Sequence, residues 1–561
     1  MKSMILILGV ALLAAASAQQ PQPGETPDPK KLGAIEGSVF NAATGAALRR
    51  VNLTLRPSIS GMIQQSPMSP AAPYAATTDA EGKFRIESIE PGTYMLHAER
   101  QGFARQQYSS RAPSLLGTPL AISAAAEIKE LNLKLIPQAI VTGRVLDDEG
   151  EPIAGITLQV YRSMRIRGKQ QLRQSAGSQT NDTGEFRIAD LAPGRYWLSA
   201  TERNNAAMFG EAAPRNTTGK PQEAYVTTYF PASIDQDGAR PIELIGGQTL
   251  ASIDIRMRKE RVYRVRGKVA APNSVKNLRI MLNPREATGS MMMFGNNSGQ
   301  VKEDGTFEIS KVAPGAYYAV AFIAQGMIRS VGRAPIDVTR EDIDDVMVPY
   351  SAGMTVTGTI RVDGEMEGKK ISFESIRIQL IPVGGSFNFA TSTTTAEGVF
   401  KIENASPDNY RFQASGLPPG LWIKAIGDGA RDILNSGLDL SAGSNAPIEI
   451  VLGVGTGTLT GVVQDAKQQL TPGVMVNLLP DPMKEDRNDL HRSVTTDQNG
   501  KFNLANIPPG DYKLYAWESF DPSNSLDPEL LKANETRAKK IKIQPNSQEQ
   551  LQLTSIPPPG K

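Results

Sequence analysis

Apolar and polar residues alternate over short stretches of this chain, and one alternating pattern occurs five times. In the first copy Gly82 is followed by Phe84 and Ile86, and Tyr94 stands ten residues after the Phe, as it does in every copy. Alternation places every second side chain on one face of a strand, so each copy predicts two half-buried β-strands. The Gly, Phe and Tyr positions of the five copies are Gly82, Phe84, Tyr94; Gly184, Phe186, Tyr196; Gly305, Phe307, Tyr317; Gly398, Phe400, Tyr410; and Gly500, Phe502, Tyr512.

Each copy also contains two turn signals. A cluster rich in Asp, Asn or Glu precedes the motif Gly, which predicts a tight turn with this Gly at positive φ. Pro-Gly precedes the motif Tyr in four copies, and Pro407-Asp408 replaces it in the fourth. Because Asp is also tolerated in turns, we expect every copy to reverse the chain between the Phe strand and the Tyr strand.

Further strands frame the motif. About forty residues before each motif Gly, another Gly opens an alternating strand; these are Gly37, Gly143, Gly267, Gly358 and Gly461. A second alternating strand follows, and one such as Leu131–Leu135 closes the copy. Six or seven short strands per copy predict a β-sandwich. The clearest helical signal is 527–537, where an Asp N-cap precedes Pro528.

The order G-x-V, two strands, T-x-D-x-x-G-x-F-x-I and L-x-P-G-x-Y-x-L-x-A resembles the carboxypeptidase regulatory-like domain. That family belongs with the transthyretin-like, Cna-B-like and starch-binding-like sandwiches, which are grouped as a carbohydrate-binding-like fold. The resemblance covers nearly all of residues 33–557 and implies an all-β tandem array of about five such sandwiches, like beads on a string. The whole chain is similar to secreted bacterial proteins built from these repeats. The predicted domains are 33–137, 138–260, 261–351, 352–455 and 456–561.

The N-terminus has the pattern of an export signal. Lys2 precedes an apolar run from Met4 to Ala15 and the small residues Ala16-Ser17-Ala18. This pattern predicts a cleavable signal peptide at 1–18, followed by a flexible leader at 19–32. The run is shorter than the roughly 20 residues of a membrane span, and an uncleaved anchor is the alternative. We expect a periplasmic, cell-surface or extracellular protein without a transmembrane segment in the mature chain.

Composition narrows the chemistry. The 561 residues include no Cys and two His, and the formal net charge is +2. The lack of Cys excludes disulfides, thiolate metal sites and a cysteine nucleophile. The near-zero charge argues against a nucleic-acid partner. No catalytic residue, metal site or cofactor is predicted.

The family resemblance raises the hypothesis of a peptidase. In zinc carboxypeptidases the motif is similar to His-x-x-Glu, but Glu99 follows His97 at the wrong offset, and His491 lies in a hairpin-type segment. We therefore expect no enzyme. The acidic stretches 147–151 and 341–345 are interpreted as solvated turns, with calcium binding left open.

Aromatic side chains and one basic hairpin are the candidate binding residues. With the motif Tyr facing inward, alternation places Trp197, Tyr318, Tyr515 and Trp517 on the opposite sheet face. Flat aromatic faces suit sugar rings, although the same face could pack against a neighbouring loop or domain. Arg165 and Arg167 lie in a segment, 162–173, with five positive charges and no acid. It could contact an anionic glycan or lipid head group, or be a solvated hairpin tip.

Three functional hypotheses follow. The first is a secreted, non-catalytic binding or scaffold protein with carbohydrate, such as a surface polysaccharide, as the ligand class. The second is a structural spacer or adhesion rod of the cell envelope, with surface proteins as partners and no small ligand. The third is an accessory chain of a hydrolase, for which the sequence nominates no pair of carboxylates.

Overall fold

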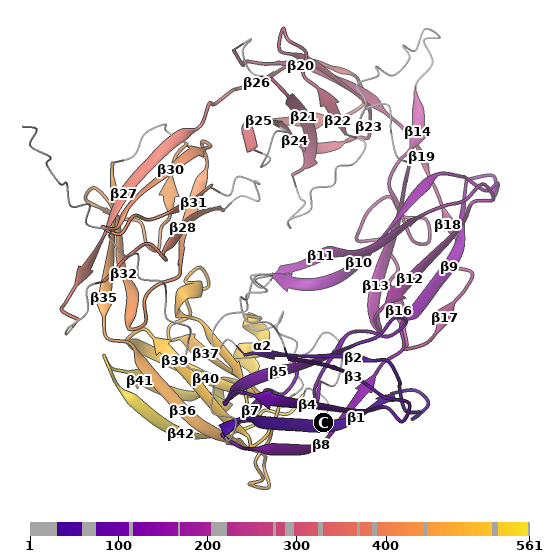
Figure 1. Ribbon diagram of the computed structural model, residues 1–561. Helices are drawn as coiled ribbons and strands as arrows, with labels where there is room; N and C mark the ends of the chain where they lie inside the picture. The colour runs from indigo at the N-terminus through magenta and orange to yellow at the C-terminus, as the bar shows by residue number, and fades with distance from the viewer. Residues whose placement is uncertain are drawn as a thin grey trace, which may run out of the picture.

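The computed structural model is a series of five β-sandwiches (Figure 1). It describes residues 31–58, 74–110, 116–166, 169–202, 222–272, 276–285, 297–323, 329–366, 371–383, 390–441, 446–518 and 526–558. The all-β tandem fold is therefore confirmed. The predicted signal peptide and most of the predicted leader lie outside the described residues.

The first domain shows how each sandwich is built. In one sheet β1 (Gly33–Asn41) pairs antiparallel with β4 (Lys83–Ile89) and parallel with β8 (Glu127–Leu135). The second sheet has the order β3-β2-β5-β6, and β7 also pairs with β5. The strands of that sheet are β2 (Asn52–Pro57), β3 (Tyr74–Thr77), β5 (Gly92–Glu99), β6 (Gln106–Gln107) and β7 (Leu120–Ile122).

The second and third domains repeat this plan. In the second domain the sheets are β12-β9-β17, with β18 on β9, and β11-β10-β13-β15, with β16 on β13; β14 pairs with β19. In the third domain they are β23-β20-β26 and β22-β21-β24-β25. The strands are β9 (Ala139–Leu146), β10 (Ile156–Ile166), β11 (Lys169–Gln179), β12 (Glu185–Leu191), β13 (Gly194–Glu202), β14 (Glu223–Tyr225), β15 (Thr228–Tyr229), β16 (Ile242–Leu244), β17 (Thr249–Leu250), β18 (Ile255–Arg256), β19 (Lys259–Arg261), β20 (Tyr263–Val269), β21 (Leu278–Pro284), β22 (Ser298–Gln300), β23 (Thr306–Val312), β24 (Gly315–Ile323), β25 (Arg329–Val338) and β26 (Ile343–Val348).

The fourth and fifth domains each add one feature to the plan. In the fourth, the sheets are β30-β27-β35-β32-β33 and β29-β28-β31-β34, so the first sheet gains a hairpin. In the fifth, the sheets are β39-β36-β42 and β38-β37-β40-β41, and the helix α2 (Pro528–Ala533) is added. The strands are β27 (Met354–Asp363), β28 (Arg377–Pro382), β29 (Ala390–Thr393), β30 (Val399–Ala405), β31 (Asn409–Ser415), β32 (Leu421–Asp428), β33 (Arg431–Asp432), β34 (Leu438–Asp439), β35 (Ile448–Val454), β36 (Gly457–Gln464), β37 (Met475–Pro480), β38 (Arg492–Thr495), β39 (Lys501–Ile507), β40 (Gly510–Trp517), β41 (Lys539–Ile543) and β42 (Gln548–Thr554).

The motif Phe and Tyr side chains are buried in separate cores, one for each sandwich. Each motif Tyr also donates its hydroxyl to the carbonyl oxygen four residues earlier, as Tyr512 does to Pro508 at 2.8 Å. This bond satisfies the polar end of an aromatic ring whose body lies in the core. The motif Tyr therefore contributes to the core and also stabilises the turn that precedes it.

The motif Gly adopts positive φ in all five copies, between 71° and 86°, as expected. The two strands that flank Pro-Gly do not pair with each other. The Phe strand β4 lies in the sheet of β1, whereas the Tyr strand β5 lies in the sheet of β2, so Pro-Gly carries the chain from one sheet to the other. The sequence does not distinguish a hairpin within one sheet from a crossing between two sheets. Alternation and turn residues are the same in both cases and do not specify which strands will pair.

A residue in the left-handed conformation precedes each crossing. It could not be recognised from the sequence, because its side chain differs in every copy but the last two. It stands four residues after the motif Phe, with φ between 54° and 61°, where the pairing register shifts. Such a bulge bends the strand and increases its twist. The five residues are Ser88, Asp190, Lys311, Asn404 and Asn506.

The predicted helix is present and shorter than expected. Asp527 accepts hydrogen bonds from the backbone N–H groups of Glu529 and Leu530, and Pro528 is the first helical residue. The helix ends at Ala533, and a 3₁₀ turn at Glu535–Arg537 follows. A second 3₁₀ turn, Asn488–Leu490, lies between β37 and β38.

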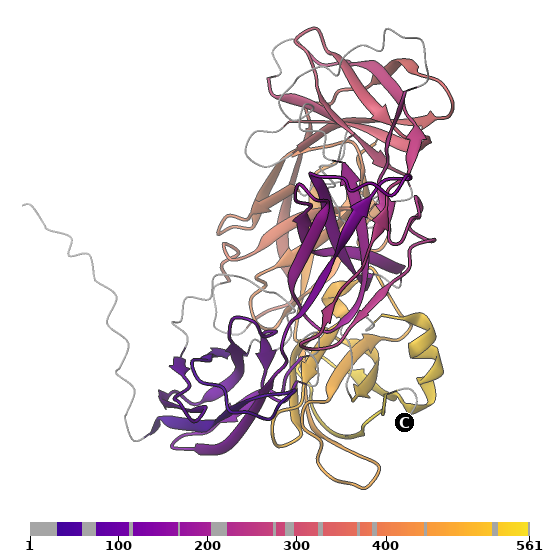
Figure 2. The same cartoon turned by 90° about the vertical axis from the view of Figure 1, so that its right-hand side faces the viewer.

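The five domains follow one another around a ring, and the first and fifth domains lie side by side (Figures 1 and 2). Polar side chains make several of the contacts between neighbouring domains. One of them is Asp408, the residue that replaces Gly in the fourth Pro-Gly turn; its carboxylate is buried beside Arg333 of the third domain. Among the described residues, ion pairs between neighbouring domains include Glu202–Lys311 (3.7 Å), Arg333–Asp408 (3.6 Å) and Arg411–Asp486 (2.9 Å).

Candidate functional site

A cavity of about 240 Å³ lies in the fifth domain, between the outer face of its second sheet and α2. Strand β40 alternates: Tyr512 and Leu514 point into the sandwich core, while Lys513 and Tyr515 point toward the helix. Apolar side chains supply most of the wall and ionic groups the remainder. The lining residues are Leu479, Pro480, Asp481, Met483, Glu485, Lys513, Tyr515, Leu526, Pro528, Leu531, Lys532 and Glu535.

Lys513 is the ionic centre of this cavity. Its ammonium group lies 3.0 Å from Asp481 Oδ1 and 2.9 Å from Glu535 Oε1. Hydrogen bonds to these two carboxylates raise the pKa of Lys513, and the bond from Lys513 lowers the pKa of Glu535. These shifts keep Lys513 and Glu535 charged at neutral pH. The two ion pairs of Lys513 tie the end of β37, β40 and the turn after α2 together.

Two aromatic rings form the inner side of the site. Tyr515 and Trp517 are stacked, with ring centroids 5.4 Å apart and planes inclined by 2°. Tyr515 lines the cavity, whereas Trp517 is packed beneath with Leu479 and Ile556 and is 4% exposed. The expectation that Tyr515 and Trp517 present free flat faces is therefore corrected: both residues are 4% exposed, and helix α2 and its flanks cover this face of the sheet.

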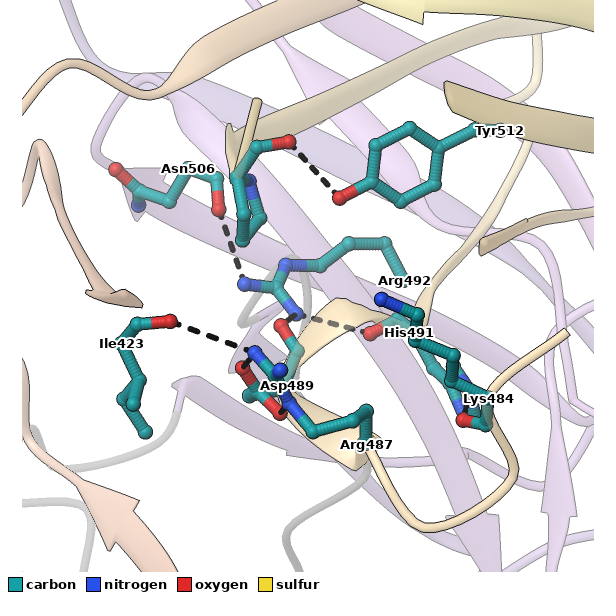
Figure 3. Close-up of polar contacts among 9 residues, drawn as sticks. Ile423, Lys484, Arg487, Asp489, His491, Arg492, Asn506 and Tyr512 are labelled. Atoms are coloured by element: carbon teal, nitrogen blue, oxygen red, sulfur yellow. Dashed lines mark hydrogen bonds and ion pairs between the residues drawn. The ribbon is translucent and has the colours of Figure 1, made fainter. Parts of the chain in front are cut away.

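The loop between β37 and β38 lines the cavity and also contacts the fourth domain. Figure 3 shows this contact, between Arg487 and Ile423. Asp481, Met483 and Glu485 line the cavity from this loop. A few residues on, the Arg487 guanidinium binds both carboxylate oxygens of Asp489, at 2.7 Å each, and Nη2 lies 3.4 Å from the Ile423 carbonyl oxygen of the fourth domain. One loop therefore forms a wall of the cavity and a domain contact.

Arg492 holds the end of the same loop (Figure 3). Its guanidinium donates to the carbonyl oxygens of Asp489, His491 and Asn506 at 2.7–2.9 Å. Burial lowers the pKa of Arg492. The side-chain oxygen of Asn506, at the left-handed position described above, lies 3.4 Å from the Gly420 backbone nitrogen of the fourth domain.

The other predicted binding residues are dispersed. Trp197 is half-buried on β13, with the Arg195 guanidinium 5.4 Å from its ring centroid. Tyr318 is half-buried on β24, beneath Arg285 and Arg333 at 5.8 and 5.3 Å. Each aromatic residue lies in its own domain, so these residues do not form one site.

The basic hairpin lies only partly within the described residues. Its backbone pairs Arg165 with Gln170 between β10 and β11. The side chain of Arg165 and the whole of Arg167 lie outside the described part, so their binding role stays a prediction.

Neither acidic stretch forms a cation cage. Asp147 accepts hydrogen bonds from the backbone N–H groups of Glu149 and Glu151, as in a tight turn. Asp342 accepts one from Arg264, and Asp344 pairs with the Arg266 guanidinium at 3.0 Å. Within the described ranges there is no group of three or more His, Cys, Asp or Glu placed to hold a metal ion.

The two His residues lie in different domains, and His97 gives the first domain a pH dependence. Burial, together with Arg105 and Arg56, lowers the pKa of His97 to about 4. The unfolded side chain has a pKa near 6.5, so between these values the unfolded state binds the extra proton. Neutral His97 therefore contributes its full stabilisation to the folded first domain above about pH 6.5. This contribution is lost as the pH falls toward 4.

We therefore expect the first domain to lose about 2 kcal/mol of stability between pH 7 and pH 4, allowing for the partial exposure of His97. Urea titrations followed by hydrogen exchange in β2 and β5 measure this loss within the full chain. His97→Gln should remove most of the slope in the first domain. An unchanged slope in this variant would assign the pH dependence to other groups.

The sequence predicted Tyr515 and missed its partners in the cavity. Lys513 looked like a solvent-facing residue of an alternating strand, and Asp481 and Glu535 looked like ordinary loop and helix-end charges. The available signal was the helix at 527–537, which needs an apolar surface on which to pack. The outward Leu479, Tyr515 and Trp517 supply that surface.

Three of the five domains match a known family. The sequence model of the carboxypeptidase regulatory-like domain matches residues 34–122, 140–223 and 458–554. A search of curated proteins finds no match. No helix of the described residues is both long and apolar enough to cross a membrane.

The chain is also similar to several solved pilin structures. The minor pilin GBS52 of Streptococcus agalactiae has 14% identity and a TM-score of 0.22, over 41% of this chain and 96% of that one. The major pilin subunit BcpA of Bacillus cereus has 11% identity and a TM-score of 0.16, over 74% of this chain and 99% of that one. The shaft pilin SpaA of Lactobacillus rhamnosus GG has 13% identity and a TM-score of 0.18, over 40% and 96%.

Proposed function

We propose that this chain, a multi-domain β-sandwich protein with carboxypeptidase regulatory-like domains, is an exported, non-catalytic binding and scaffold protein whose ligand class is carbohydrate. The observation that carries the proposal is the cavity between β40 and α2, where Tyr515 lies beside Lys513, Asp481 and Glu535. The five sandwiches position this site and form the scaffold that would bind partners in the periplasm, at the cell surface or outside the cell.

The cavity has the chemistry that a sugar needs. The Tyr515 ring, stacked on Trp517, gives the cavity an apolar aromatic wall for the C–H edges of a sugar. Carboxylates accept hydrogen bonds from hydroxyl groups, and ammonium groups donate hydrogen bonds to them. Mostly apolar walls with a few placed polar groups are typical of small-ligand sites. At about 240 Å³ the cavity suits one sugar unit, so a terminal residue of a polysaccharide would enter it.

Binding to a glycan array followed by calorimetric titration tests this function. Tyr515→Leu should weaken binding about tenfold by removing the aromatic wall of the cavity, which corresponds to about 1.4 kcal/mol. Lys532→Gln, at an exposed position on the cavity wall, should weaken it severalfold without unfolding the domain. Lys401→Gln, in an exposed ion pair of the fourth domain, is the matched control.

Two results would count against the carbohydrate function. One is no retention of the folded chain on any glycan. The other is binding by Tyr515→Leu and Lys532→Gln that equals binding by the Lys401→Gln control. Thermal unfolding of each variant separates a lost contact from a lost fold.

A purely structural spacer is the second candidate, and the contacts between domains favour it. The domain pairs are fixed by Glu202–Lys311, Arg333–Asp408 and the Arg487 network, none of which requires a ligand. A rod predicts an extended particle in solution scattering. A ring-shaped scaffold predicts a compact one.

A further inference from the structure

The first and fifth domains contact each other across 377 residues of sequence. The side-chain amide of Gln498 accepts a hydrogen bond from the backbone N–H of Ala121 and donates one to its carbonyl oxygen, both at 2.8 Å. Beside this pair, Gly473 of the fifth domain lies against the Thr118 side chain of the first. We name these four residues the closing contact; the two domains that they join lie side by side in Figures 1 and 2.

In the closing contact, a side chain takes the position of a β-strand. Strand β7 pairs with β5 on one side, and the N–H and C=O groups of Ala121 point to the other side. An edge with unpaired backbone groups accepts a further strand. The Gln498 amide has one face with a donor and an acceptor, like a peptide group, and it completes this edge at a single residue.

The turn that carries Gln498 leaves its side chain available. The Asp497 carboxylate makes the local turn bonds, to the backbone N–H groups of Asn499 and Lys501 at 2.9 Å. The equivalent positions in the other copies hold Ala80, Asp182, Glu303 and Ala396, none of which has an amide. The fifth copy alone therefore has a side chain that can both donate to and accept from one backbone residue.

The second half of the closing contact opposes closure. Thr118 is 1% exposed, and its hydroxyl oxygen has no hydrogen-bond partner in the described residues. A buried hydroxyl without a partner loses its bonds to water. The gain from the Gln498 bonds and the cost at Thr118 are of similar size, so closure is finely balanced.

We propose that the closing contact is a reversible, intramolecular joint that holds the five-domain chain in a ring and, when it opens, frees the β7 edge. The occupant of that edge is the fifth domain of the same chain, because the four preceding domain junctions already bring it there. The joint needs no ligand, so it stands independently of the carbohydrate function.

Spin labels on the full chain measure the joint directly. The protein has no Cys, so Ser123→Cys and Asn499→Cys, both exposed and next to the contact, give one labelled pair. The doubly labelled protein without further substitutions should show a dominant short distance between the two labels in double electron–electron resonance. Gln498→Ala should lower the closed-to-open ratio about tenfold, and Thr118→Val, which keeps the shape and removes the hydroxyl, should raise it.

A control variant and two outcomes decide whether the joint exists. Glu303→Ala, at the equivalent turn position of the third domain, should leave the distances unchanged. A doubly labelled protein without the short distance, or the same closed fraction in Gln498→Ala and Glu303→Ala, would overturn the joint. A short distance that appears only between differently labelled chains, and grows with concentration, would assign the contact to head-to-tail assembly instead.

Discussion

Replacing Gly358 with alanine should destabilise the fourth domain by about 3 kcal/mol. Gly358 lies in the middle of β27, which pairs with β30 on one side and with β35 on the other. A Cβ built at this position would overlap the Ile448 carbonyl oxygen and the Phe400 ring, with Cε1 of the ring at 2.8 Å. Both neighbours are held in the sheet and the core, so neither can move away at low cost.

Gly427→Ala is the matched control in the same domain. It lies in β32, and the nearest atom to its Cβ would be 3.6 Å away, an ordinary van der Waals contact. Hydrogen exchange under increasing urea, read in β27 and β30, reports the stability of the fourth domain within the full chain. Equal stabilities of the two variants would show that the close approach at Gly358 does not constrain the fold.

Replacing Arg487 with methionine should cost the fifth domain about 3 kcal/mol and loosen its junction with the fourth. Arg487 is 7% exposed and makes two short bonds to Asp489. Removing one partner of a buried ion pair leaves the other charge without compensation, which is more costly than removing both. The bond to the Ile423 carbonyl is lost at the same time.

Two further variants make this prediction specific. Arg487→Met combined with Asp489→Leu should recover part of the stability, because both charges are then absent. Arg361→Met, in an exposed ion pair with Glu449, should cost about 0.5 kcal/mol or less. Chemical denaturation with exchange read in β37 and β38 measures all three. A loss in Arg487→Met no greater than in Arg361→Met would contradict the structural role of the network.

Much of each sandwich could be predicted from the sequence because the determinants are local. The Phe-to-Tyr spacing and the motif Gly define strand faces and turns over a dozen residues, and all five copies behave alike. The glycines predicted to open strands lie inside them instead, as Gly358 does in Met354–Asp363. The reason for a Gly there is not local, because Gly358 approaches Ile448, some ninety residues later. The passage of the chain from one sheet to the other at Pro-Gly was not predicted either, because it depends on pairing with strands far away in the sequence.

The candidate site and the closing contact were harder to predict because their polar residues look like solvated ones. Lys513 occupies a polar position of an alternating strand, and only α2 turns that face into a cavity. Gln498 stands in a turn where any polar residue would serve, and only the ring brings it to Ala121. In both cases the function of a side chain depends on an element far away in the sequence.

Hydrogen exchange of the full chain, with and without a polysaccharide that it retains, tests the binding function most directly. The account predicts new protection in 481–485, in β40 around Tyr515 and in 526–535, with little change in the first four domains. Protection confined to other domains, or no protection at saturating polysaccharide, would contradict the assignment of the fifth-domain cavity as the binding site.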